Sequence, residues 1–136
     1  MIKVTINGAS GKMGTKVSNL IKNDSSLVEC FDDISCSDLV IVFSQPSSTK
    51  TILKKCVAAK KPIIIGTTGF TNDDLNEIRE AANLIPIVLA ANMSRGMIYL
   101  KKSLASFIHH NQDKLRCFIE ETHHLEKVDK PSGKSY

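Results

Sequence analysis

The chain of 136 residues contains no tryptophan, and its aromatic residues are only two tyrosines and five phenylalanines. Its lysines occur in scattered pairs, at 54–55, 60–61 and 101–102, and form no stripe interleaved with aromatic side chains. A net charge of +4 distributed in this way is typical of solvated helix surfaces, so we expect no nucleic-acid partner. The apolar runs are too short to cross a bilayer, so we expect no membrane partner either.

Cysteine is also sparse, and none of the four cysteines forms a Cys-x-x-Cys pair. Cys30 and Cys36 are too isolated to predict a zinc site, whereas Cys56 and Cys117 lie among apolar residues and are expected to be buried. This usage suits a reducing compartment, and the first residues predict a strand, not a signal peptide. We therefore expect a cytoplasmic protein.

Apolar patterning predicts strands that alternate with helices along most of the chain. The predicted strands are 2–6, 27–31, 39–43, 62–65 and 85–90, and the predicted helices are 12–22, one from a cap at Ser47 or Ser48 to Ala59, and one from Thr71 through Ala82. The run at 39–43 is apolar throughout, as in a strand covered on both faces. This alternation predicts an α/β fold in which helices cover both faces of a parallel sheet.

The pattern changes after Asn92, where a longer amphipathic helix from about Gly96 to His110 precedes a strand from about Leu115 to Thr122. We therefore expect a domain boundary near 93–95. Residues 1–93 would form the parallel-sheet domain, and residues 94–136 the first part of a second, α+β domain.

The first predicted strand leads into Gly8-Ala9-Ser10-Gly11-Lys12-Met13-Gly14, a Gly-x-x-Gly-x-x-Gly segment that opens a helix. Glycines at such a turn let the backbone approach a pyrophosphate at the helix N-terminus, so the segment predicts dinucleotide binding. Asp32 and Asp33 follow at roughly the 20-residue spacing of an acid that bonds the adenosine ribose. No arginine stands beside them to receive a 2′-phosphate, which favours NADH, although Lys12 could hold that phosphate and the aspartates could simply form a turn.

Two further segments follow strands, Gly66-Thr67-Thr68-Gly69 and Ala90-Ala91-Asn92-Met93-Ser94. Ligands of open parallel sheets bind outside the carboxyl ends of the strands, so both segments are expected to line a nicotinamide pocket.

A polar segment between Glu120 and Ser135 combines His123 and His124 with Lys127 and a Pro-Ser-Gly turn at 131–133. An imidazole moves protons near neutral pH, and a helix N-terminus binds a carboxylate, so the segment predicts a site that protonates a small acidic substrate.

A second histidine pair, His109-His110, falls at the predicted end of the long helix, and we interpret it as surface charge there. A metal site built from the four histidines would lack a carboxylate or thiolate at ligand spacing, so we expect none.

Taken in order, these segments resemble the dihydrodipicolinate reductase family, and the resemblance runs through all 136 residues. It is carried by five blocks at 8–14, 42–46, 66–70, 91–96 and 121–133. It implies a Rossmann-like domain, NADH or NADPH as cofactor, and reduction of 4-hydroxy-tetrahydrodipicolinate, a cyclic dicarboxylate, to tetrahydrodipicolinate in lysine and diaminopimelate biosynthesis. It also implies a homotetramer for the full-length family.

The family's functional residues carry over onto matching positions. The resemblance implies His123 as proton donor, assisted by Lys127, and substrate contacts from His124, Lys127, Ser132 and Gly133. Lys134 could pair with a substrate carboxylate. The implied cofactor-binding residues are Gly8, Ala9, Ser10, Gly11, Lys12, Met13, Gly66, Thr67, Thr68, Ala90, Ala91, Asn92 and Met93, with Asp32 as the ribose acid.

The chain departs from the family at three points. Val42 stands where the family usually has an aspartate, and Lys130 and Lys134 replace a small alanine and threonine. Family members also continue beyond the position of Tyr136, so we expect this chain alone to be at best a poor reductase. Two alternatives are a nucleotide-binding module without catalysis, and one half of a split enzyme that needs a C-terminal partner.

Overall fold

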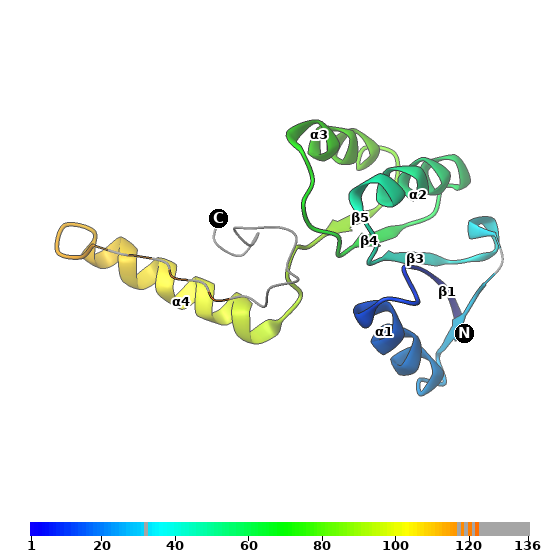
Figure 1. Ribbon diagram of the computed structural model, residues 1–136, viewed down its shortest axis with the longest axis horizontal. Coiled ribbons are helices and arrows are strands. Elements are labelled where there is room, and N and C mark those ends of the chain that lie inside the picture. The colour runs from blue at the N-terminus through cyan, green and yellow to red at the C-terminus, as the bar shows by residue number, and fades with distance from the viewer. Residues whose placement is uncertain (32, 117, 119, 121, 123–136) are drawn as a thin grey trace. The chain divides into compact units, whose positions relative to one another are not determined.

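The computed structural model describes residues 1–31, 33–116, 118, 120 and 122, and divides the chain into two compact units, Met1–Ala91 and Asn92–Tyr136. The first unit contains five strands and three α-helices (Figure 1). In chain order they are β1 (Ile2–Asn7), α1 (Lys12–Lys22), β2 (Leu27–Glu29), a 3-10 turn η1 (Ile34–Cys36), β3 (Leu39–Val42), α2 (Pro46–Ala59), β4 (Ile63–Ile65), α3 (Asn72–Ala81) and β5 (Ile87–Leu89).

The five strands form one sheet in the order β2-β1-β3-β4-β5, and every neighbouring pair is parallel. Helix α1 lies on one face, whereas α2 and α3 lie on the other (Figure 1). The direction in which successive strands are added to the sheet changes between β1 and β3. β2 lies outside β1, whereas β3, β4 and β5 extend the sheet on the other side of β1. These observations confirm the predicted doubly wound parallel sheet.

The main core lies between the sheet and the α2–α3 layer. Its members alternate along the strands with residues of the opposite face, as the two-residue period of a strand requires. They include Val40, Val42, Leu53, Cys56, Ile63, Ile65, Ile78, Ala81 and Ile85. Cys56 is fully buried there, as predicted, and burial raises the pKa of its thiol to about 11. Cys117 lies outside the described residues.

The other face of the sheet carries a smaller cluster under α1, formed by Val4, Ile6 and Ile21. Its cover stops short of the β5 edge, where Val88, the register partner of Ile64, is 54% exposed. The run at 39–43 is therefore covered on both faces, as expected, but less completely on the α1 face than on the α2–α3 face.

Local sequence explains where most of the helices begin. The Thr71 hydroxyl accepts from the backbone N–H of Asp74, and the Asp74 carboxylate accepts from the backbone N–H of Thr71, which forms a capping box at the start of α3. The predicted cap of α2 at Ser47 or Ser48 is wrong, because Gln45 is the N-cap and Pro46 occupies the first turn. A proline suits that position because its missing N–H needs no partner there, and it keeps the preceding residue extended.

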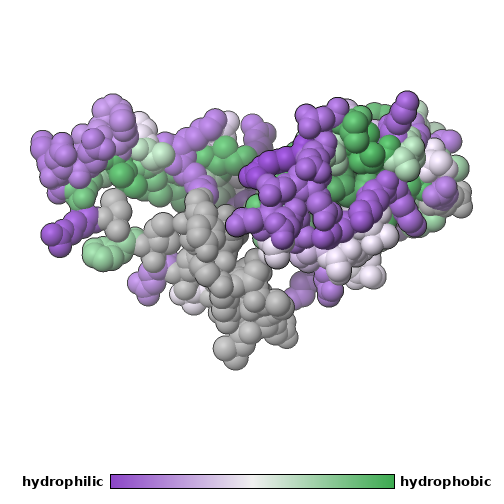
Figure 2. Space-filling model, turned by 90° about the horizontal axis from the view of Figure 1, so that it is seen from above, coloured by the Kyte–Doolittle hydropathy of each residue, from purple (hydrophilic) through white to green (hydrophobic). Residues whose placement is uncertain are grey.

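The second unit contains α4 (Arg95–Asn111), one residue longer at each end than predicted. The Ser94 hydroxyl caps it by accepting from the N–H of Met97. No side chain of α4 is buried among the residues that the structure describes, and Leu100, Leu104 and Phe107 are each about half exposed or more. Figure 2 shows this hydrophobic surface along α4, beside hydrophilic side chains.

The predicted strand from Leu115 to Thr122 lies partly outside the described residues. Those that are described there, 115, 116, 118, 120 and 122, are not in a strand. Among the described helices, none is long and apolar enough to span a membrane.

Candidate functional site at the carboxyl edge of the sheet

The residues predicted to bind a cofactor in the first unit gather at one edge of the sheet. Because all five strands are parallel, the segments that follow β1, β3, β4 and β5 leave the sheet at the same edge. Backbone hydrogen bonds join them there: Phe43 N–H donates to Asn7 at 2.9 Å, Gly66 N–H to Val42 at 2.8 Å, and Ala90 N–H to Ile65 at 3.0 Å. Gly8, Gly66 and Ala90 are thus brought to neighbouring positions from across the chain.

The fold requires glycine to different degrees at the three glycine positions of the loop after β1. Gly8 has φ +92°, and a Cβ there would lie 2.5 Å from the carbonyl oxygen of Phe43. A Cβ on Gly14 would lie 2.0 Å from the carbonyl oxygen of Gly8, so Gly14 lets α1 start directly against the loop. A Cβ on Gly11 would meet only the Gly8 oxygen, at 3.3 Å. The fold therefore requires Gly8 and Gly14 much more than it requires Gly11.

The start of α1 is suited to an anion. Gly11 is its N-cap in an extended conformation, and among the described residues no side chain caps the helix and no acid occupies its first turn. Backbone N–H groups in the first turn of a helix have no partner within the helix, and the helix dipole adds partial positive charge there. The loop is held in place by the Thr15 hydroxyl, which donates to the carbonyl oxygen of Ala9 at 3.1 Å.

The acids near the end of β2 divide into three cases. Asp32 lies outside the described residues. Asp33 is the N-cap residue of η1, and its carboxylate accepts from the Ser35 hydroxyl at 3.0 Å. Glu29 pairs in register with Val4, three residues before β1 ends, and accepts a short hydrogen bond from the Ser18 hydroxyl of α1. This hydrogen bond joins β2 to α1, so the Glu29 carboxylate helps to hold α1 on the sheet.

A group of hydroxyls behind the carboxyl edge was not predicted from the sequence. The Thr67 hydroxyl, which belongs to a predicted cofactor segment, is turned inward, and Thr67 is only 5% exposed. It donates to the carbonyl oxygen of Ser44 at 2.9 Å and lies 2.9 Å from the hydroxyl of Thr49 on α2. Ser48, also on α2, donates to the side-chain oxygen of Asn7 at 3.2 Å. These contacts tie the ends of β1, β3 and β4 to the first turn of α2.

Phe43 and Gly66 are packed against each other at the same edge. A Cβ on Gly66 would lie 2.2 Å from Cε1 of the Phe43 ring. Glycine therefore lets the backbone after β4 lie directly against that ring. The sequence signals for this pair were only the glycine that stops β4 and the aromatic residue that ends the apolar run at 39–43.

The starts of α2 and α3 are joined by charge. The Lys50 ammonium lies 3.0 Å from Asp74 and 3.0 Å from Glu77. Hydrogen bonds from the backbone of Thr71 and from Lys50 lower the pKa of Asp74 to about 2, and its two carboxylate partners raise the pKa of Lys50. This network ties α2 to α3 near the end of the segment that follows β4.

The structure does not place the other predicted site residues at this edge of the first unit, because they belong to the second unit or lie outside the described residues. Asn92 and Met93 belong to the second unit, where the Asn92 side-chain oxygen accepts from the N–H of Ser94 at 2.8 Å. The proposed proton donor and substrate contacts, which are His123, His124, Lys127, Ser132, Gly133 and Lys134, lie outside the described residues. Within the described part of the chain no group of three or more His, Cys, Asp or Glu residues could hold a metal ion.

The second histidine pair lies at the end of α4. The rings of His109 and His110 are 5.6 Å apart in an edge-to-face arrangement, and Nδ1 of His110 lies 2.7 Å from the carbonyl oxygen of Ser106. Both side chains are exposed, which agrees with their interpretation as a surface pair.

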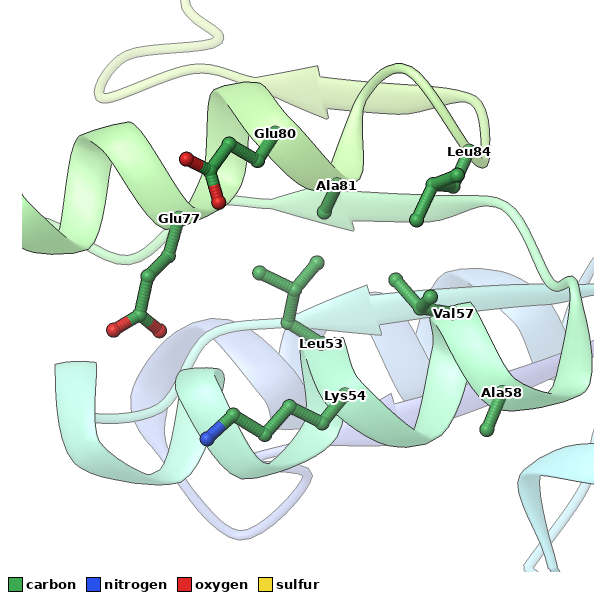
Figure 3. A pocket seen from close by; sticks show the side chains of 8 residues that line it. All are labelled: Leu53, Lys54, Val57, Ala58, Glu77, Glu80, Ala81 and Leu84. Carbon is green, nitrogen blue, oxygen red and sulfur yellow. The ribbon is translucent and has the colours of Figure 1, made fainter.

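An apolar groove of about 410 Å³ lies between α2 and α3 (Figure 3). Leu53, Val57, Ala81 and Leu84 line it, with Lys54 and two glutamates among its other lining residues. Its lining comes from the later turns of both helices, which run back from the carboxyl edge in a βαβ unit. The groove is therefore separate from the glycine loop.

Comparison with known proteins identifies relatives over nearly the whole chain. The chain is 33% identical over 152 residues to 4-hydroxy-tetrahydrodipicolinate reductase of Clostridium tetani, covering 98% of this chain and 60% of that enzyme. It is 36% identical over 137 residues to the enzyme of the same name from Alkaliphilus oremlandii, covering 94% and 57%. The chain thus spans about 60% of the length of the curated relatives it matches.

A solved structure shares the fold. Dipicolinate-bound dihydrodipicolinate reductase from Paenisporosarcina sp. TG-14 matches with a TM-score of 0.72 at 21% identity, covering 100% of this chain and 63% of that one. The family pattern described as "Dihydrodipicolinate reductase, N-terminus" matches residues 24–93, just over half of the chain, including β3, β4 and β5 with the segments that follow β3 and β4. The chain therefore belongs to the dihydrodipicolinate reductase family.

Proposed function

We propose that this chain carries the cofactor-binding part of a reductase that converts 4-hydroxy-tetrahydrodipicolinate to tetrahydrodipicolinate in lysine and diaminopimelate biosynthesis, in the cytoplasm. The observation that carries the proposal is the loop from Gly8 to Gly14, placed between a parallel strand and the start of α1 at the switch point of the sheet, a helix start that no described side chain caps. The names of the family's members support the substrate.

The glycine loop fits the pyrophosphate of a dinucleotide. At Gly11 the only described atom close to an added Cβ is the Gly8 oxygen at 3.3 Å, so glycine there leaves the backbone approachable without being required by the fold. Residues Gly8 to Met13 would hold the phosphates, and the segments at Gly66–Thr68 and 90–93 would hold the nicotinamide end. Since Thr67 turns its hydroxyl inward, its contribution would come from its backbone.

The fit favours NADH or NADPH, with a preference for NADH. No arginine follows Asp32 and Asp33 to receive a 2′-phosphate. Asp32 is the proposed ribose acid, since the carboxylate of Glu29 is bonded to Ser18.

When bound, the reduced nicotinamide supplies a hydride to the ring of the substrate. The protein's part is to orient the two reactants and to supply the proton, after which the hydroxyl group leaves as water. We assign the proton to His123, assisted by Lys127, on the family resemblance. Ser132 and Gly133, with His124 and Lys134, would hold the substrate carboxylates.

On this proposal residues 1–93 are the dinucleotide domain and 94–136 begin the substrate domain, which in the complete family member would also form a homotetramer. The exposed apolar face of α4 is consistent with a helix that receives further cover in the complete enzyme.

The first test is direct cofactor binding, followed by the fluorescence of NADH and of NADPH as each is titrated with the chain. We expect saturable binding that Gly11→Val abolishes, because a branched side chain fills the space that the pyrophosphate needs. Ala58→Val, which adds bulk to an exposed position of α2, should leave binding unchanged. A parent chain that binds neither nucleotide would contradict the proposal.

The second test is turnover. Oxidation of NADH with freshly made substrate is measured for the chain alone, and for the chain mixed with a polypeptide matching the remaining C-terminal part of the Clostridium tetani relative. Turnover that appears only in the mixture would show that both parts are needed for catalysis. Cofactor binding without turnover in either case would favour a nucleotide-binding module.

A further inference from the structure

We infer that Thr49, on α2, is a positioning residue for the cofactor segment Gly66–Thr68, an inference that rests on the function proposed above. Thr49 is not part of the glycine loop or of any segment that the family resemblance assigns to the cofactor. It acts through the hydroxyl of Thr67, which it contacts behind the carboxyl edge of the sheet.

Both residues of this contact are buried, so the loss of either hydroxyl should have an energetic cost. Thr49 is 1% exposed and Thr67 is 5% exposed, and their hydroxyl oxygens are 2.9 Å apart. A buried hydroxyl that loses its partner retains the cost of its desolvation, so the structure favours the arrangement in which both are bonded. The contact joins residues 18 positions apart, from α2 and from the end of β4.

Thr49 and Thr67 each bring one hydroxyl proton to this group of contacts. The Thr49 hydroxyl donates to the carbonyl oxygen of Gln45 at 3.0 Å and lies 3.5 Å from the hydroxyl of Ser44, and the Thr67 hydroxyl donates to the carbonyl oxygen of Ser44 at 2.9 Å. The backbone N–H of Thr49 already donates to Gln45 at 2.9 Å. The Gln45 carbonyl therefore stays paired when the Thr49 proton turns from it to the Thr67 oxygen, 2.9 Å away, while Thr67 keeps its bond to Ser44.

This chain of bonds fixes the backbone that the cofactor would meet. The side chain of Thr67 is held from two sides, by Ser44 after β3 and by Thr49 on α2, so the peptide groups of Gly66 and Thr68 are held with it. The ring of Phe43 also packs against this segment, at Gly66. The backbone at Gly66–Thr68 is thereby clamped, and Thr49 supplies the one part of the clamp that comes from a helix.

The experiment compares Thr49→Val, which removes the hydroxyl while keeping the shape, with Thr49→Ser, which keeps the hydroxyl. Two readouts are recorded on the full chain: the amide resonances of residues 66–69 by NMR without nucleotide, and NADH affinity by fluorescence. We expect Thr49→Val to displace those resonances and to raise the Kd for NADH about tenfold, and Thr49→Ser to restore both.

Thr67→Val removes the same contact from the other side and supplies a second variant. If Thr49 acts through Thr67, the double variant should bind NADH about as weakly as either single variant, not about a hundredfold more weakly than the parent. Cys56→Ala is the matched control, since Cys56 is equally buried on the same helix but belongs to the hydrophobic core. It should lower stability without changing either readout.

The outcomes separate this inference from the function on which it rests. Parent-like amide resonances in Thr49→Val, with a loss of stability like that of Cys56→Ala, would overturn the positioning role. A parent chain that binds neither NADH nor NADPH would overturn the proposed cofactor, while the amide resonances would still decide whether Thr49 positions the segment. Additive losses in the double variant would show that Thr49 does not act through Thr67, and would also overturn the inference.

Discussion

Alanine at Gly11 and alanine at Gly14 should have opposite consequences, although the two glycines belong to the same loop. At Gly14 the added Cβ would lie 2.0 Å from the carbonyl oxygen of Gly8 and 2.7 Å from the Cα of Ala9. Both neighbours are backbone atoms, so α1 itself must shift away from the loop. Overpacking of this kind costs about 1–3 kcal/mol, and the better helix propensity of alanine offsets at most about 1 kcal/mol of it.

At Gly11 the backbone already has φ −77° and ψ 169°, which alanine adopts without strain. The single close contact, 3.3 Å to the Gly8 oxygen, needs a shift of only a few tenths of an ångström. A glycine replaced at a compatible position loses freedom in the unfolded chain, which stabilises by about 0.4–1 kcal/mol. The free energy of unfolding should therefore stay within about 0.5 kcal/mol of the parent value, while the Kd for NADH rises by about tenfold or more.

Urea unfolding followed by far-ultraviolet circular dichroism measures the stability of both variants. The cofactor's own fluorescence measures affinity without interference, because the chain contains no tryptophan. A loss of about 2 kcal/mol in Gly14→Ala corresponds to a fall in Tm of roughly 10 °C for a domain of this size. A Gly14→Ala variant as stable as the parent, or a Gly11→Ala variant that loses stability but binds NADH normally, would refute the assignment of roles within the loop.

Four further predictions test other parts of the structure. Gly66→Ala should lower the free energy of unfolding by about 1–3 kcal/mol, because the added Cβ meets the Phe43 ring. In a Phe43→Ala background, which removes that ring, the same substitution should cost less than half as much. Equal costs in the two backgrounds would exclude the clash. Asp74 has a folded-state pKa of about 2 against an ordinary 3.8, so its stabilisation is present above pH 3.8 and is lost as the pH falls towards 2; urea midpoints between pH 5 and pH 2 should fall less steeply in Asp74→Asn than in the parent. Lys60 caps α2 with φ 53°, so Lys60→Gly should raise the free energy of unfolding by about 0.5–1 kcal/mol, and a loss of stability would contradict this reading. In a complete enzyme His123→Ala should lower kcat by about 10²–10⁴-fold with little change in KM, and a rate within a few-fold of the parent would remove His123 from the mechanism.

The fold could be predicted from the sequence because its signals are local. Each strand is a short apolar run, and the capping box at α3 is contained in the four residues from Thr71 to Asp74. The one wrong helix start, at α2, came from preferring serine caps over the proline at the first turn.

The candidate site also has a local part that could be predicted from the sequence and a non-local part that could not. The glycine loop proposed to bind the pyrophosphate occupies seven consecutive residues, from Gly8 to Gly14, and its pattern could be recognised from their spacing alone. The clamp on Gly66–Thr68 could not, because it is made by Thr49 from α2 and by Ser44 and Phe43 after β3. Nothing in the sequence near Thr67 says that its hydroxyl turns inward, away from the position where a cofactor contact was expected.

The acids after β2 show how register decides between candidates that sequence spacing leaves open. Sequence spacing directed attention to Asp32 and Asp33 and passed over Glu29, which lies at the end of β2. The pairing of Glu29 with Val4 puts it three residues below the carboxyl edge at Asn7, and its carboxylate is bonded to Ser18. An acid in that position stabilises the contact between α1 and β2, so its loss should lower stability before it affects nucleotide preference. Ligands of open parallel sheets bind outside the carboxyl ends of the strands, so the ribose acid is proposed among the residues beyond Glu29.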